Sequence, residues 1–210
     1  ALYDDRASSQ FAAARQSNVV IGEPKMQRVV DLVGPHRFCG RVVTGFQRGS
    51  KELGWPTANL DPAAFESSLD AATEGVYVGW AAVSGPSLRP EDREIHKAVL
   101  SVGWNPHFDD VKQRTLEAYL CHDFNGHDFY GEQMHLMVCA FLRPQAKFES
   151  LEALIEAITT DVQFGKDALD RPELLLMRQD PFFAEQAMPP AAETPSGARG
   201  EEAAAAKSAD

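Results

Sequence analysis

The chain has 210 residues, 44% of them hydrophobic and 24% charged, which is the composition of a folded globular domain. Its formal net charge of −11 has the wrong sign for gripping a nucleic-acid backbone, so we expect no nucleic-acid partner. No apolar run approaches the ~20 residues of a membrane span, so we expect no membrane partner either.

The two ends of the chain differ in composition from its middle. We interpret residues 1–36 as an N-terminal extension without a signal-peptide pattern, with short helices at 11–15 and 26–33. Residues 184–210 are mostly Ala, Glu, Pro, Gly and Ser, which predicts a flexible acidic tail. The 3 cysteines form no Cys-x-x-Cys pair, which favours a reducing compartment and a cytoplasmic protein.

The stretch from about residue 37 to 142 is typical of β-strands, because short β-branched and aromatic runs alternate with Gly, Pro, Asn and Asp. In one run, Leu116, Ala118 and Leu120 share a face, and Glu117 lies on the opposite one. Consecutive strands without helices between them favour antiparallel pairing, and closing the sheet removes its edges. We therefore predict a mainly β protein built on a small closed barrel. The predicted strands are 38–44, 76–83, 97–102, 115–120 and 133–142.

A helix is predicted after the last strand, at about residues 150–169. Ser150 is a candidate N-cap, and Pro172 limits how far the helix extends. We expect its apolar stripe to pack on the barrel. The predicted domain therefore includes the helix and the segment after it, and extends over residues 37–183. The stripe consists of Leu151, Leu154, Ile155, Ile158 and Val162.

The segment 40–59 holds the densest group of unusual residues. Gly45 and Gly49 let the backbone turn its amides toward an anion, and Arg48 and Lys51 add positive charge. The spacing is not that of a Walker A loop. On spacing alone, both a phosphate-binding loop and a hairpin turn with solvated charges remain open.

Three further polar residues are candidates for chemistry. Thr57 and Asn59 project to the same side if their segment is extended, and they offer a hydroxyl and an amide oxygen to a hard cation such as Mg²⁺. As isolated residues they are equally typical of turns. Glu117 can accept a proton from an attacking hydroxyl, or it is a solvated residue on the polar face of its strand.

Several short motifs occur together and in a recognisable order. They are Gly-Ser-Lys (49–51), Pro-Thr-Ala-Asn (56–59), Gly-Trp-Asn-Pro (103–106), Asp-Phe-Tyr-Gly-Glu (128–132) and Leu-Arg-Pro (142–144). Over about residues 38–183 the chain resembles the eukaryotic riboflavin kinase (flavokinase) family. The resemblance implies a six-stranded antiparallel Greek-key barrel with a C-terminal helix. It also implies transfer of the γ-phosphate of ATP to the 5′-hydroxyl of riboflavin, giving FMN and ADP, with Mg²⁺ or, in some members, Zn²⁺.

The resemblance implies a role for each residue that matches a family motif. Glu117 stands at the position of the catalytic glutamate. Thr57 and Asn59 match the pair that binds the metal, and Arg143 matches an arginine near the flavin. The residues implied at the ATP site are Gly45, Arg48, Gly49, Ser50, Lys51, Thr57, Asn59, His122 and Tyr130.

Some positions depart from the family pattern, and other functions stay open. Gln47, Ala118 and Tyr119 replace commoner residues and put substrate affinity in question. One alternative is a non-catalytic flavin- or nucleotide-binding barrel that acts as an adaptor, against which the presence of Glu117 weighs. Another is an enzyme that continues to FAD, for which the residues before the barrel are too few. We expect a monomer whose partners are the small molecules ATP, riboflavin, ADP and FMN.

Overall fold

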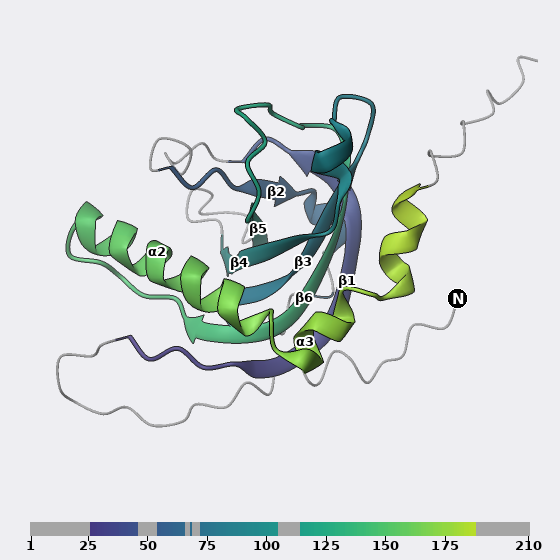
Figure 1. The fold of residues 1–210 in the computed structure, drawn as a ribbon. Helices are drawn as coiled ribbons and strands as arrows, with labels where there is room; N and C mark the ends of the chain where they lie inside the picture. The colour runs from purple at the N-terminus through teal and green to yellow at the C-terminus, as the bar shows by residue number, and fades with distance from the viewer. Residues whose placement is uncertain (1–25, 46–53, 66–67, 69–71, 105–113, 188–210) are drawn as a thin grey trace, which may run out of the picture.

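The computed structural model describes residues 26–45, 54–65, 68, 72–104 and 114–187. Six strands form a closed antiparallel barrel in the order β1-β2-β5-β4-β3-β6, followed by helices at the C-terminal end (Figure 1). The strands are β1 (Asp31–Val43), β2 (Ala58–Leu60), β3 (Gly75–Ser84), β4 (His96–Trp104), β5 (Arg114–Leu120) and β6 (Gln133–Pro144). The helices are η1 (Pro62–Ala64), η2 (Pro90–Arg93), α2 (Leu151–Ala168), α3 (Pro172–Met177) and η3 (Pro181–Ala187). The prediction of a six-stranded closed barrel with a C-terminal helix is confirmed.

The first strand begins earlier than the sequence pattern suggested. Asp31 already pairs with Phe141 of β6, and the Val29 amide donates to the carbonyl of Leu142. The helix predicted at 26–33 is therefore wrong, because the long strand β6 takes this segment as its partner. The predicted domain boundary at residue 37 lies inside β1. The helix predicted at 11–15 lies outside the described residues.

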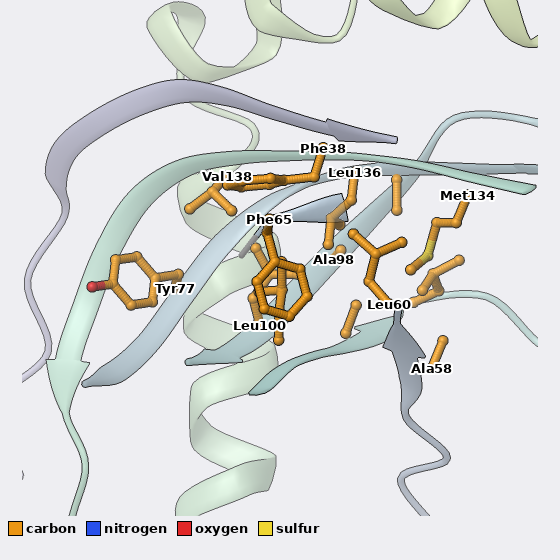
Figure 2. Packing of buried hydrophobic residues seen from close by; sticks show 14 of the residues in the cluster. Phe38, Ala58, Leu60, Phe65, Tyr77, Ala98, Leu100, Met134, Leu136 and Val138 are labelled. Atoms are coloured by element: carbon orange, nitrogen blue, oxygen red, sulfur yellow. The ribbon is translucent and has the colours of Figure 1, made fainter. Parts of the chain in front are cut away.

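Alternating side chains of the strands fill the interior of the barrel. In Figure 2, Phe38, Leu60, Leu100 and Leu136 point into this interior, together with Phe65 from the segment after β2. The face predicted for β5 is confirmed, because the side chains at 116, 118 and 120 are buried whereas those at 117 and 119 are half-buried on the outside. Removal of this apolar surface from water is the main term that stabilises the barrel.

A second apolar cluster lies on the outer side of β3 and β6, under the C-terminal helices. It includes Val78, Trp80 and Met137 from the strands, and Leu174 and Phe183 from the C-terminal segment. The indole Nε1 of Trp80 donates a hydrogen bond to the carbonyl of Leu174 at 2.9 Å. The wall formed by β3 and β6 is therefore buried on both faces, and the helices are part of the folding unit.

Helix α2 approaches the barrel with its C-terminal half. Ser150 caps the helix as predicted, its side chain accepting from the amide of Ala153. A Cβ on Gly165 would lie 2.7 Å from Cγ1 of Val78, so the glycine permits this close approach. The prediction that Leu151 packs on the barrel is wrong: its side chain is 53% exposed, because the N-terminal turns of α2 extend beyond the strands (Figure 1). None of the helices in the described ranges has the length and hydrophobicity needed to cross a membrane.

Candidate functional site

Strand pairing brings three polar side chains together on the outer wall of the barrel. Asn59 of β2 lies directly opposite Glu117 of β5. Thr57 is two residues before Asn59, and its Oγ1 donates a hydrogen bond to Oε2 of Glu117 at 3.4 Å. These three side chains are half-buried, because the alternating residues Ala58 and Ala118 take the inner face. A hydroxyl, an amide and a carboxylate thus converge at one place.

The backbone of Gly45 lies against the Asn59 amide. A Cβ at position 45 would lie 2.0 Å from Nδ2 of Asn59, a distance that real Cβ atoms do not show. Position 45 therefore accommodates only glycine while Asn59 keeps its place beside Glu117.

Thr57, Asn59 and Glu117 line a cavity of about 980 Å³. Its walls come from residues 54–59, the outer face of β5, the β5–β6 loop (residues 121–132) and one side of α2. A cavity of this size lies at the upper end of the range for small-molecule sites. It is bounded by chain segments far apart in the sequence.

The cavity brings together most of the site residues that the sequence predicted. Gly45, Thr57, Asn59, Glu117, His122 and Tyr130 all line it. The predicted ATP-binding residues Arg48, Gly49, Ser50 and Lys51 lie outside the described residues. The predicted flavin-binding residue Arg143 is not among the residues that line the cavity.

Arg143 is instead buried between β6 and α2. Its Nη2 and Nε bind the Asp161 carboxylate at 2.6 and 3.0 Å, and its Nη1 donates to the carbonyl of Pro144. Arg28 binds the same carboxylate through Nε at 2.7 Å. In this structure, therefore, the guanidinium of Arg143 fixes the position of α2, which forms one wall of the cavity.

Sequence reasoning missed the contribution of α2 to the site. Thr159, Gln163 and Lys166 line the cavity, and their spacing of four and three residues places them on one side of the helix. The sequence does show that this side of the predicted helix is polar. A polar helix face by itself indicates only exposure to solvent, so it did not point to a binding site. Two aromatic residues also line the cavity: Trp55 packs edge-on against Tyr119, with ring centroids 5.1 Å apart.

Two cavity residues keep their protons at neutral pH. Burial raises the pKa of the Cys121 thiol to about 11, and burial also raises the pKa of the Tyr119 phenol. Because only the thiolate is a strong nucleophile, Cys121 is an uncharged wall residue and not a candidate for covalent catalysis.

The oxygen atoms of Thr57 and Asn59 are of the type that Mg²⁺ binds. The parts of the chain that the structure describes hold no group of three or more His, Cys, Asp or Glu side chains arranged for a metal ion. The hydroxyl and amide oxygens of Thr57 and Asn59 would fit a hard cation that shares its remaining ligands with a substrate.

Comparison with known proteins agrees with this fold. The profile of the Flavokinase family, described as riboflavin kinase, matches residues 32–169, and the chain belongs to this family. The riboflavin kinase of Mus musculus is 42% identical over 147 residues, and that of Homo sapiens is 41% identical over 147 residues; each alignment covers 70% of this chain and 89% of the relative. The crystal structure of riboflavin kinase from Trypanosoma brucei superimposes with a TM-score of 0.54 at 32% identity, covering 70% of this chain and 88% of the other.

Proposed function

We propose that this chain is an ATP:riboflavin 5′-phosphotransferase, which converts riboflavin and ATP to FMN and ADP. The observation that carries the proposal is the position of Glu117, opposite Asn59 and hydrogen-bonded to Thr57 in the wall of a substrate-sized cavity. Membership of the riboflavin kinase family supports the same activity. The adaptor alternative requires this arrangement to have no catalytic use.

In phosphoryl transfer, the protein itself takes little part in making and breaking covalent bonds. The enzyme must align the attacking hydroxyl with the γ-phosphorus, balance charge on the phosphate oxygens and accept a proton. In the proposed mechanism, Glu117 accepts the proton of the riboflavin 5′-hydroxyl as the oxygen–phosphorus bond forms. The bond from the γ-phosphorus to the bridging oxygen breaks, and ADP leaves.

The other residues bind and orient the two substrates. Thr57 and Asn59 would hold Mg²⁺, or Zn²⁺ in its place, together with the ATP phosphates; the cation would neutralise charge on the phosphate oxygens. Gly45 with Arg48, Gly49, Ser50 and Lys51 is proposed to bind the phosphates, and His122 and Tyr130 to bind the nucleotide. Arg143, implied at the flavin by family resemblance, is proposed to act on the flavin side of the cavity through α2.

We also infer a monomer that works in the cytoplasm on small molecules alone. The spacing of the three cysteines, which form no Cys-x-x-Cys pair, supports a reducing compartment.

The substitution Glu117→Gln tests the proposal. The amide keeps the shape of the side chain and cannot take the proton, so kcat should fall at least ~100-fold while binding of MgATP and riboflavin is nearly unchanged. FMN formation measures kcat, and calorimetry measures binding. Glu173→Gln, which removes a carboxylate from the exposed surface of α3, is the matched control. A Glu117→Gln enzyme with more than half of the normal kcat would refute the assignment, and binding of both ligands without FMN formation by the natural chain would favour the adaptor.

A further inference from the structure

A buried carboxylate in the β3–β4 loop (residues 85–95) binds a residue of the cavity wall. Asp92 of η2 is 1% exposed. Arg89 binds it with Nε at 2.8 Å and Nη2 at 2.6 Å, and the ring Nε2 of His122 lies 2.8 Å from its Oδ1. His122 follows β5 and lines the cavity. A residue outside the cavity is thus hydrogen-bonded to one inside it.

The His122 ring is held from other sides as well. The His96 ring stacks on it with centroids 4.1 Å apart and planes 18° apart, and Phe124 meets it edge-on at 4.8 Å. The Nε2 of His96 lies 3.2 Å from the backbone carbonyl of Asp92. Stacking and hydrogen bonding together leave the His122 ring little rotational freedom.

The β3–β4 loop also contacts both ends of the β5–β6 loop. Near the first end, Nη2 of Arg89 donates to the carbonyl of Asp123 at 3.3 Å. At the last end, the amide of Ser87 donates to Oε1 of Glu132 at 3.1 Å. The β5–β6 loop forms a wall of the cavity, so the β3–β4 loop supports that wall at two points.

The charge on Asp92 determines which nitrogen of a neutral His122 carries the proton. Hydrogen bonding to Arg89 holds the pKa of the Asp92 carboxyl well below its ordinary value, so the group is ionised and only accepts hydrogen bonds. The Nε2 of a neutral His122 must then carry the proton, and Nδ1 is the nitrogen left to accept a hydrogen bond from a ligand.

We propose that Asp92 is a positioning residue for nucleotide binding, which acts by fixing the orientation and the tautomer of His122 at the cavity. This inference rests on the proposed function, in which the cavity takes MgATP. It gives the β3–β4 loop, which does not line the cavity itself, a role in the affinity of the site for nucleotide.

The test compares two substitutions in the same short helix. Asp92→Asn keeps the shape and removes the charge that binds Arg89 and His122. Glu91→Gln removes the same charge from a side chain that is 56% exposed and contacts Arg89 at 3.3 Å. For Asp92→Asn we expect the Kd of the magnesium complex of a non-hydrolysable ATP analogue to rise about 5- to 10-fold, and KM for MgATP to rise more than kcat falls. For Glu91→Gln we expect neither change.

A double-mutant cycle separates positioning from a general structural role. His122→Phe keeps the stacked ring and removes both nitrogens. In that background, Asp92→Asn should cause no further loss of affinity. It should still lower the melting temperature, because the Asn side chain binds Arg89 more weakly than the carboxylate does. Nitrogen NMR of the full-length chain should show His122 protonated at Nε2, with its signals moved by Asp92→Asn and not by Glu91→Gln.

Each outcome decides the inference separately from the proposed function. Unchanged His122 signals and unchanged affinity in Asp92→Asn would overturn it, as would an equal loss of affinity in the His122→Phe background. If Asp92→Asn does not fold, Arg89→Gln, whose side chain is 30% exposed, should weaken binding in the same direction, and no weakening would count against the inference. A natural chain that binds the nucleotide but forms no FMN would refute only the kinase activity.

Discussion

Arg143 at the end of β6 and Asp161 in the middle of α2 form a buried ion pair, with side chains 4% and 3% exposed. The pair joins the barrel to the helix whose neighbouring residues Thr159 and Gln163 line the cavity. Arg28, just before β1, binds the same carboxylate. A single carboxylate thus holds three segments of the chain together and places one wall of the site.

Loss of the Asp161 charge should destabilise the protein strongly. Asp161→Asn removes the negative charge that pairs with Arg28 and Arg143, which are both largely shielded from water. We therefore expect a loss of about 3–5 kcal/mol in the free energy of unfolding. Denaturation in urea measures the loss. Asp180→Asn is the matched control, because it breaks an arginine pair with Arg37 whose side chains are 38% and 19% exposed. The control should cost no more than ~1 kcal/mol, and equal losses in the two variants would contradict the role assigned to Asp161.

Removal of the Thr57 hydroxyl should weaken the response to magnesium. Thr57→Val keeps the side-chain shape and removes a proposed oxygen ligand, so FMN formation at limiting Mg²⁺ should fall and excess Mg²⁺ should restore part of it. The measurement is a magnesium titration at fixed ATP and riboflavin. Thr115→Val, which removes a hydroxyl from β5 two residues before Glu117, should leave the titration unchanged. Normal activity of Thr57→Val at limiting metal would rule out the ligand.

The sequence alone predicted the long strands because they are runs of β-branched and aromatic residues that Gly, Pro, Asn and Asp separate. It missed β2, since the three residues Ala58–Leu60 are too few to show a period, and the sixth strand followed only from family resemblance. It misjudged the start of β1, because Gly34 and Pro35 are typical of a loop and only pairing with β6 makes this segment a strand.

The candidate site could also be predicted only in part from the sequence. The types of Thr57, Asn59 and Glu117 and their motifs were visible in the sequence, but their convergence depends on the register of β2 against β5, in which Asn59 lies opposite Glu117. The hydrogen bond from His122 to Asp92 joins residues 30 positions apart. No periodicity indicates such a pair, because it forms when two loops meet at one end of the barrel.

The thiols should react in the order of their exposure and thiolate content. Iodoacetamide at about pH 8 should modify the exposed Cys39 first. Cys121 should react slowly: burial raises its pKa to about 11, and at this pH only roughly a thousandth of the thiol is ionised. Cys139 is fully buried, its pKa is raised to about 12 by burial, and it should not react in the folded chain.

While the pH stays below the pKa of Cys121, the modification rate of this thiol should rise about tenfold for each unit by which the pH is raised, since only the thiolate attacks. Mass spectrometry of digested samples follows each cysteine separately. Riboflavin with MgADP should protect Cys121, which lines the cavity, and should leave Cys39 unprotected. Cys121 labelling as fast as that of Cys39 at about pH 8 would contradict the raised pKa.

The last prediction concerns the C-terminal limit of the folding unit. Phe183 is 2% exposed in the outer cluster, and the carbonyl of Leu174 accepts the hydrogen bond of the Trp80 indole. A chain that stops after Phe148 loses both, leaves Arg143 without Asp161 and exposes the outer face of β3 and β6, so we expect it to be insoluble or unfolded. A chain that stops after Phe183 removes 27 residues that are mostly Ala, Glu, Pro, Gly and Ser, and it should keep its melting temperature and its FMN formation. Thermal melts and activity assays on both truncations decide the matter: a soluble, active chain ending at Phe148 would show that the helices are dispensable, and a large loss of melting temperature in the longer chain would move the boundary beyond Phe183.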